Sequence, residues 1–165
     1  MRFSDMISSI IIDGKICNSE YLKISIGSNT IRYGISIFEA PKIFFTPNNA
    51  YLYRFNLYYE RLCRSCRLLD IEFPFTMEEL VNQITLLKNA NNYSNEMGIR
   101  INVLNMQRGE LVEKVVPNVV ISLLDLSKRN DSNLEAKKIR IADYRRSKNA
   151  NMYAIKSPSN YEISR

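Results

Sequence analysis

Two neighbouring helical patterns lie in the middle of a chain whose other segments are typical of strands and turns. The first has one apolar stripe with members at spacings of four and three residues: Phe55, Tyr59, Leu62, Cys66 and Leu69. The second begins at a capping box, Thr76-Met-Glu-Glu79, and its predicted inner face is formed by Met77, Leu80, Ile84 and Leu87. A helix with a single apolar face must bury it against another layer, so both helices require a partner.

Strand patterns on both sides of the helices supply that partner. They cover residues 7–12, 15–17, 35–45, 50–54, 96–105 and 117–126. Asp13-Gly14 is typical of a type I′ hairpin turn between the first two. Strands outnumber helices and hairpins join several of them. The sequence therefore predicts an α+β fold, a small two-layer domain of mostly antiparallel sheet with two helices on one face.

A polar, charged segment from Ser127 to Glu135 has no apolar periodicity and predicts a linker. We therefore expect a small N-terminal α/β domain over residues 1–127, a linker over 128–137 and the start of a second domain over 138–165. Residues 138–144 predict its first strand, and Asn160–Arg165 the opening of a helix with Ser159 as N-cap. No amphipathic turn follows, so we expect this second domain to be incomplete and the chain truncated.

Composition excludes several function classes. The 165 residues include no histidine, which removes histidine-dependent catalytic triads and histidine zinc sites. The three cysteines are too few for a disulfide framework, and Cys63-Arg-Ser-Cys66 lies inside a predicted helix without a second pair, so no metal site is expected. The net charge of +6 is scattered, which argues against a nucleic-acid module. With no signal peptide and no membrane-length apolar run, we predict a cytoplasmic protein that does not enter membranes.

Two basic residues, Lys156 and Arg100, each have a structural and a functional interpretation. Lys156 follows a short apolar run and precedes Pro158. A lysine amine forms a Schiff base with a carbonyl only when burial or a cationic neighbour activates it, whereas a lysine beside Pro and Ser is usually a solvated loop residue. Arg100 interrupts a strong strand pattern. Either it faces solvent, or its planar guanidinium faces a cleft and binds a carboxylate.

Three stretches in order resemble class IV (fold type IV) pyridoxal-phosphate aminotransferases of the branched-chain type. Arg32-Tyr-Gly-Ile-Ser-Ile-Phe-Glu39 is similar to that family's tyrosine-glycine and phenylalanine-glutamate signature. Tyr53-Arg54 with Glu60-Arg61-Leu62 and Ser65 is similar to its arginine-bearing helix, and Tyr144-Arg-Arg146 with Lys156 and Asn160-Tyr161 to the segment of its Schiff-base lysine. The resemblance covers nearly the whole chain.

The resemblance implies a role for each matching residue and pyridoxal 5′-phosphate as cofactor. Lys156 would form the Schiff base and move the proton between the substrate α-carbon and cofactor C4′, Arg61 would bind the cofactor phosphate, and Tyr161 would bond the ring hydroxyl. The substrate pocket would be lined by Tyr33, Phe38 and Arg100, with Arg100 near a carboxylate. The implied reaction passes the amino group of a branched-chain amino acid to 2-oxoglutarate. The implied assembly is a homodimer of the complete protein.

The sequence also departs from the family. Ser157-Pro-Ser159 replaces residues that are usually small, often glycines, and Arg32 replaces a histidine common in branched-chain enzymes. Much of the cofactor domain, including the acidic partner of the pyridine nitrogen, would lie beyond Arg165. The alternatives are an aminodeoxychorismate lyase or D-amino-acid aminotransferase of the same family, an inactive N-terminal remnant, or half of a split enzyme with a complementing C-terminal chain. A basic nucleic-acid-binding domain rests on net charge alone.

Overall fold

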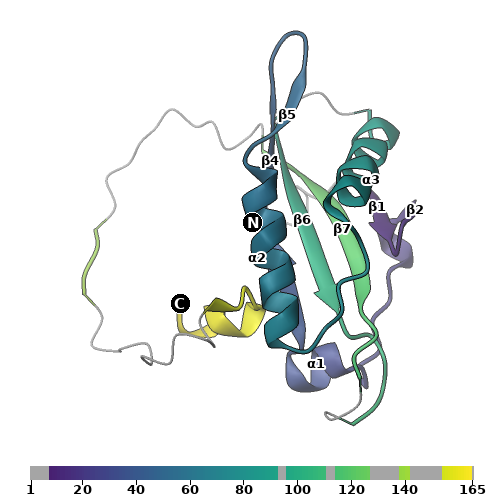
Figure 1. The fold of residues 1–165 in the computed structure, drawn as a ribbon, viewed down its shortest axis with the longest axis vertical. Helices are drawn as coiled ribbons and strands as arrows, with labels where there is room; N and C mark the ends of the chain where they lie inside the picture. The colour runs from purple at the N-terminus through teal and green to yellow at the C-terminus, as the bar shows by residue number, and fades with distance from the viewer. Residues whose placement is uncertain (1–7, 93–95, 111–113, 127–137, 142–153, 165) are drawn as a thin grey trace.

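The computed structural model describes residues 8–92, 96–110, 114–126, 138–141 and 154–164 (Figure 1). The strands are β1 Ser9–Ile12, β2 Lys15–Asn18, β3 Ser36–Glu39, β4 Lys42–Phe45, β5 Ala50–Leu52, β6 Met97–Leu104 and β7 Asn118–Asp125. The helices are α1 Asn29–Tyr33, α2 Phe55–Leu68 and α3 Met77–Ala90, with 3₁₀ turns η2 Ser19–Tyr21 and η4 Pro158–Ser164. Strands therefore predominate, as the sequence predicts.

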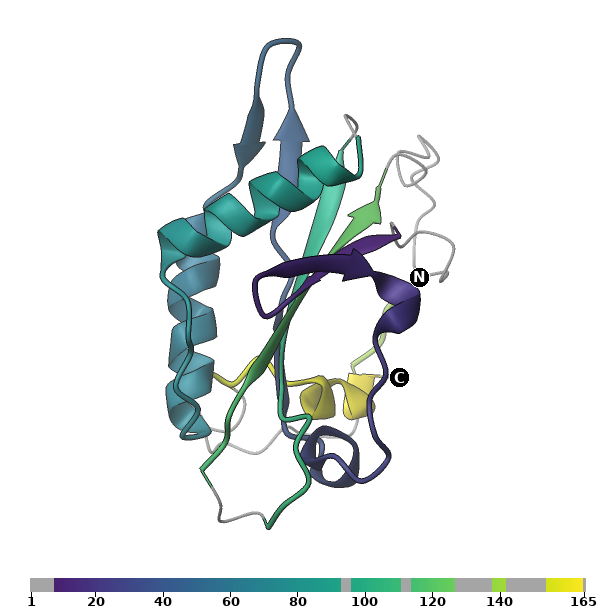
Figure 2. The ribbon, with the colours of Figure 1, turned by 90° about the vertical axis from the view of Figure 1, so that its right-hand side faces the viewer.

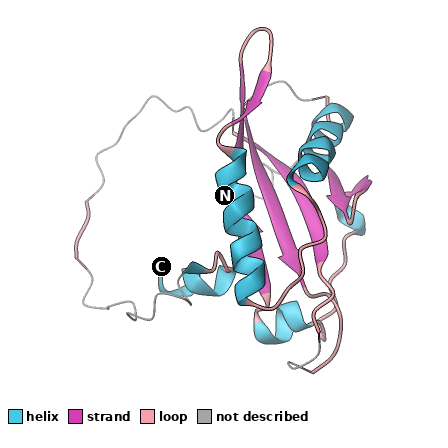
Figure 3. Cartoon of the chain, in the orientation of Figure 1, coloured by secondary structure: helices cyan, strands magenta, loops and turns pink. Residues whose placement is uncertain are grey.

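The seven strands of the described residues form one sheet in the order β2-β1-β7-β6-β4-β5, with β3 also paired to β6. Every strand pair in the sheet is antiparallel. Figure 3 shows the strands in magenta and the helices in cyan. The central strand β6 pairs with β7 along its whole length. The predicted I′ turn joins β1 to β2, with positive φ at both Asp13 and Gly14. These observations confirm the predicted α+β class.

The prediction of one continuous strand over residues 35–45 is wrong, because the structure has two strands there, β3 and β4. β3 and β4 lie on the same side of β6, and one register runs through both, from Ser36 opposite Leu104 to Ile43 opposite Met97. The ladder is interrupted at Ala40-Pro41, because proline has no N–H to donate, although the Pro41 carbonyl still accepts a hydrogen bond from Ile99 N at 2.9 Å. The edge of β3 that faces away from β6 remains open to another segment.

Helices α2 and α3 cover one face of the sheet (Figure 2). The core between the two layers consists mainly of aliphatic side chains, among them Leu62, Leu80, Ile84, Ile99, Ile101 and Ile121. Residues 99, 101 and 103 of β6 are buried on this side, which confirms the predicted alternation. Met77, predicted on the inner face, is the first residue of α3 and is 42% exposed, which corrects the prediction, whereas Gln83 is buried.

Residues 154–164 lie against β3 and the core of the sheet. The Lys156 carbonyl accepts a hydrogen bond from Phe38 N at 2.9 Å, so this segment occupies the open edge of β3, and Ile155 packs on the core. Ser159 lies inside η4 and is not the N-cap of a helix starting at Asn160, which corrects the prediction. A 3₁₀ turn starting at Pro158 suits the fixed φ of proline at a first helical position.

The predicted linker 128–137 lies outside the described residues, so the domain boundaries stay predictions. Of the predicted strand 138–144, Lys138–Ile141 are described and form no strand. Ile139 is 94% and Ile141 98% exposed, and no described strand pairs with them. No helix in the described part of the chain has the length and apolar character needed to cross a membrane.

Candidate functional site

Strand β3 presents two neighbouring side chains to opposite faces of the sheet. All four of its residues are buried, with Phe38 9% and Glu39 0% exposed. Because successive strand residues alternate in direction, Glu39 faces the helices and Phe38 faces away from them. The site is built around these two residues, from α2 on one side and the C-terminal segment on the other.

On the helix side, Glu39 binds Arg61 of α2 through two parallel hydrogen bonds. Arg61 Nε lies 2.6 Å from Glu39 Oε1, and Nη2 lies 2.8 Å from Oε2. The hydrogen bond with Glu39 raises the pKa of Arg61, and burial opposes this effect. The Arg61 side chain is 39% exposed, and a guanidinium has five N–H donors, so three remain for another anion. Glu39 thus orients Arg61 without using up its donors.

On the other side, Lys156 lies over Phe38. Its Nζ donates a hydrogen bond to the Tyr161 hydroxyl at 2.6 Å and lies 4.5 Å from the centroid of the Phe38 ring. The rings of Phe38 and Tyr161 are 5.4 Å apart between centroids. The amine is therefore held against two aromatic rings and one hydroxyl, an arrangement that fixes its direction.

Arg100 lies near the same ring. Its Cζ is 4.4 Å from the Phe38 centroid, and burial lowers the pKa of its guanidinium, an effect opposed by Tyr161 and Glu39. Within the described residues, Arg100 takes part in none of the salt bridges, which join Lys42 to Glu96, Arg61 to Glu39 and Lys114 to Glu72. Arg100 is thus partly buried beside an aromatic ring and is not the solvated arginine of the first interpretation, while its binding of a carboxylate stays a prediction.

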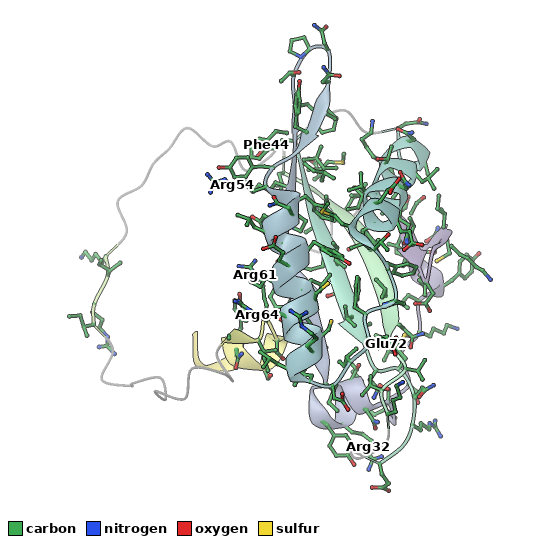
Figure 4. All side chains as sticks on the ribbon, in the orientation of Figure 1. Arg32, Phe44, Arg54, Arg61, Arg64 and Glu72 are labelled. Atoms are coloured by element: carbon green, nitrogen blue, oxygen red, sulfur yellow. The ribbon has the colours of Figure 1, made fainter. Side chains whose placement is uncertain are left out.

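The structure brings four of the six predicted site residues into direct contact. Phe38, Arg100, Lys156 and Tyr161 are linked by the contacts above. Arg61 binds Glu39 on the helix side of β3 and is near enough to Tyr161 for the two side chains to interact electrostatically. Tyr33, at the end of α1, is 37% exposed, and its described contact is the Arg32 guanidinium at 4.7 Å. No described contact links Tyr33 to Lys156. Figure 4 shows Arg61 and Arg64 along α2, with the C-terminal segment beside the lower half of that helix.

Sequence reasoning assigned no role to two residues of the site. Glu39 holds Arg61, and the signal available for it was an acidic residue inside an apolar strand pattern. Ser65 is fully buried in α2, and its Oγ accepts a hydrogen bond from Lys156 N at 3.2 Å. Ser65 lies four residues after Arg61, which places both on one face of a helix.

A cavity of about 290 Å³ lies beside Arg61, lined by Tyr53, Arg54, Leu57, Tyr58 and Arg61. A larger one of about 560 Å³, between the β4–β5 hairpin, α2 and α3, has neither Arg61 nor Lys156 on its walls. The polar groups around β3, and not the larger cavity, therefore define the candidate site. Within the described residues, no group of three His, Cys, Asp or Glu side chains is placed so that it could hold a metal ion.

Strand β3, the lysine on one side of it and the carboxylate-held arginine on the other all lie within a segment that matches a family model. Residues 36–163 match the model of the class IV aminotransferases, and this chain belongs to that family. A curated relative described as a "probable branched-chain-amino-acid aminotransferase" from Aquifex aeolicus is 38% identical over 71 residues, which cover 42% of this chain and 23% of the relative.

Solved structures of branched-chain aminotransferases share the fold. One from Thermoproteus uzoniensis, with norvaline, is 25% identical with a TM-score of 0.65, and the match covers 70% of this chain and 40% of that one. One from Escherichia coli is 18% identical with a TM-score of 0.66, covering 72% of this chain and 41% of that one. The chain therefore spans at most about two fifths of the length of these relatives.

Proposed function

We propose that this chain provides the cofactor lysine and part of the phosphate site of a pyridoxal-phosphate-dependent aminotransferase. The observation that carries the proposal is that Lys156, Tyr161 and Arg61 all lie beside β3, although Arg61 and Lys156 are 95 residues apart in the sequence. Membership of the class IV family supports it.

The described groups suit pyridoxal 5′-phosphate. Arg61 would bind the phosphate through the guanidinium donors that Glu39 leaves free, and Tyr161 would bond the ring hydroxyl. Lys156 would bond the aldehyde and move a proton at the substrate α-carbon. When bound, the cofactor supplies an electron sink for the negative charge at that carbon. The protein's share is to hold these groups in place.

For the substrate side, Phe38 would form an apolar wall and Arg100 would bind the substrate carboxylate. We propose a branched-chain amino acid with a 2-oxo acid as acceptor, since the similar proteins are described as branched-chain aminotransferases. Tyr33 would line the pocket only if a further segment or a second copy brings it near. For the complete protein we propose a homodimer, with a complementing C-terminal chain as the alternative partner.

Reductive trapping tests the proposal on the chain itself. The chain is incubated with pyridoxal 5′-phosphate, treated with borohydride and mapped by peptide mass spectrometry. We expect the label on Lys156 and its loss in Lys156→Ala. Lys15→Ala is the matched control, since Lys15 is an exposed lysine on edge strand β2, and should keep the label. Labelling spread over exposed lysines and unchanged in Lys156→Ala would refute the proposed site.

A further inference from the structure

Helix α2 contacts the site at two points one turn apart. Arg61 binds Glu39 on β3, and Ser65 accepts the Lys156 backbone N–H. Four residues along an α-helix advance about 6 Å along its axis and return to the same face. Ser65 is 0% exposed, so its hydroxyl is held by the packed interior and has little freedom to move.

The Lys156 backbone is held on its other side as well. Its carbonyl accepts the Phe38 N–H at 2.9 Å, and the preceding carbonyl, of Ile155, accepts Asn160 Nδ2 at 2.8 Å. The backbone N–H and C=O of Lys156 therefore bridge α2 and β3. Of these contacts, only the one from Ser65 ties the lysine to the helix that also carries Arg61.

We propose that Ser65 is a positioning residue that fixes Lys156 at a set distance from Arg61 through one turn of α2. The inference rests on the proposed function, in which Lys156 and Arg61 hold opposite ends of one cofactor. A rigid link between them matters because a displacement of about 1 Å at a reacting group can cost roughly 100-fold in rate. Ser65 itself touches neither cofactor nor substrate in this account.

Two substitutions separate the hydrogen bond from packing. Ser65→Ala removes the hydroxyl and leaves a small void, whereas Ser65→Cys keeps a side chain of similar size but offers only a weak sulfur acceptor. Cys66→Ala is the control, since Cys66 is the adjacent buried residue of α2 and lies in the core. Each variant is measured twice as the full chain: by hydrogen exchange of the Lys156 amide, and by the rate of borohydride-trapped labelling of Lys156 with pyridoxal 5′-phosphate.

We expect both Ser65 variants to speed exchange of the Lys156 amide up to about tenfold, the effect of losing one hydrogen bond, and to slow labelling of Lys156 by a similar factor. Cys66→Ala should change neither the exchange rate of the Lys156 amide nor the labelling rate of Lys156 beyond what its loss of global stability accounts for. An unchanged amide exchange rate in Ser65→Ala overturns the inference, and so does a defect in Ser65→Ala that Ser65→Cys lacks. If the unsubstituted chain is not labelled at Lys156, the proposed function fails, and the amide exchange alone decides whether Ser65 anchors the lysine.

Discussion

The side chain of Glu39 is 1% exposed, and Glu39 follows the apolar residues Ile37 and Phe38 in the buried strand β3. Burying a charge is costly unless a partner and hydrogen bonds compensate it, and Arg61 supplies both through its two bonds at 2.6 and 2.8 Å. The pair therefore stabilises the position of β3 against α2 and, in the same contact, sets the orientation of the guanidinium that we assign to the phosphate.

Replacing Glu39 by Gln should destabilise the fold by about 1–3 kcal/mol, because Gln keeps the size but not the charge that Arg61 requires. The partial exposure of Arg61 keeps the cost below that of a fully buried pair. Urea unfolding measures the difference. Arg64→Gln, an exposed arginine on the same helix, should stay within about 0.5 kcal/mol. Equal effects of the two substitutions would contradict the assigned role of Glu39.

Burial raises the pKa of the Cys66 thiol to about 12, with a smaller contribution from Cys63. Because the thiolate is the reactive form, Cys66 should resist alkylation in the folded chain at pH 8 and react only after unfolding in urea. Mass spectrometry of iodoacetamide-treated protein measures this. Cys17 is partly exposed and serves as the internal comparison. Labelling of native Cys66 at the rate of Cys17 would show that the thiol is not in the core.

At the scale of elements, the boundaries set by local chemistry are those the sequence predicts. The Asp13-Gly14 turn and the Thr76–Glu79 cap depend on residues within three positions of one another, and both occur as expected. The break between β3 and β4 depends on which edge of this segment faces β6. No local sequence pattern predicts that. Pro41 can be read from the sequence, but only the pairing of β3 and β4 with β6 shows that the N–H it lacks would have belonged to the ladder.

Thr76→Ala should destabilise the fold by about 1 kcal/mol, since Thr76 Oγ1 caps the first turn of α3 by accepting the Glu79 N–H at 3.2 Å. Thr85→Ala is the matched control: Thr85 lies within the same helix, is also exposed, and alanine is the better helix former. It should be neutral or slightly stabilising. Chemical denaturation distinguishes them, and a neutral Thr76→Ala would refute the capping role.

The other half of the cap predicts a pH dependence. The backbone and side chain of Thr76 lower the pKa of Glu79 by hydrogen bonding to its carboxylate. A lowered pKa in the folded state means that the contribution of Glu79 is present above its ordinary pKa and is lost as the pH falls through the lowered value. The melting temperature of the native chain should therefore approach that of Glu79→Gln in acid. A difference independent of pH would contradict this.

At the scale of the whole molecule, the site joins β3, α2 and the segment around Lys156. The resemblance assigns roles to particular residues, and the structure brings Phe38, Arg100, Lys156 and Tyr161 into contact, with Arg61 bound to Glu39 on the helix side of β3. The sequence does not predict that Glu39 binds Arg61 or that Ser65 binds the Lys156 backbone. These contacts join residues that are 22 and 91 positions apart, respectively. Tyr33 does not join the cluster through any described contact, and the predicted linker lies outside the described residues.

Comparing pyridoxal 5′-phosphate with pyridoxal tests the central assignment, that Arg61 and Lys156 hold opposite ends of one cofactor. Equilibrium binding of both is measured for the native chain, Arg61→Lys and the control Arg64→Lys. Arg61→Lys keeps a positive charge for Glu39 but loses the planar fork. We predict that it weakens binding of the phosphorylated aldehyde by roughly 10-fold and leaves binding of pyridoxal unchanged, with no effect of Arg64→Lys. Equal weakening of both aldehydes, or of neither, would contradict the account.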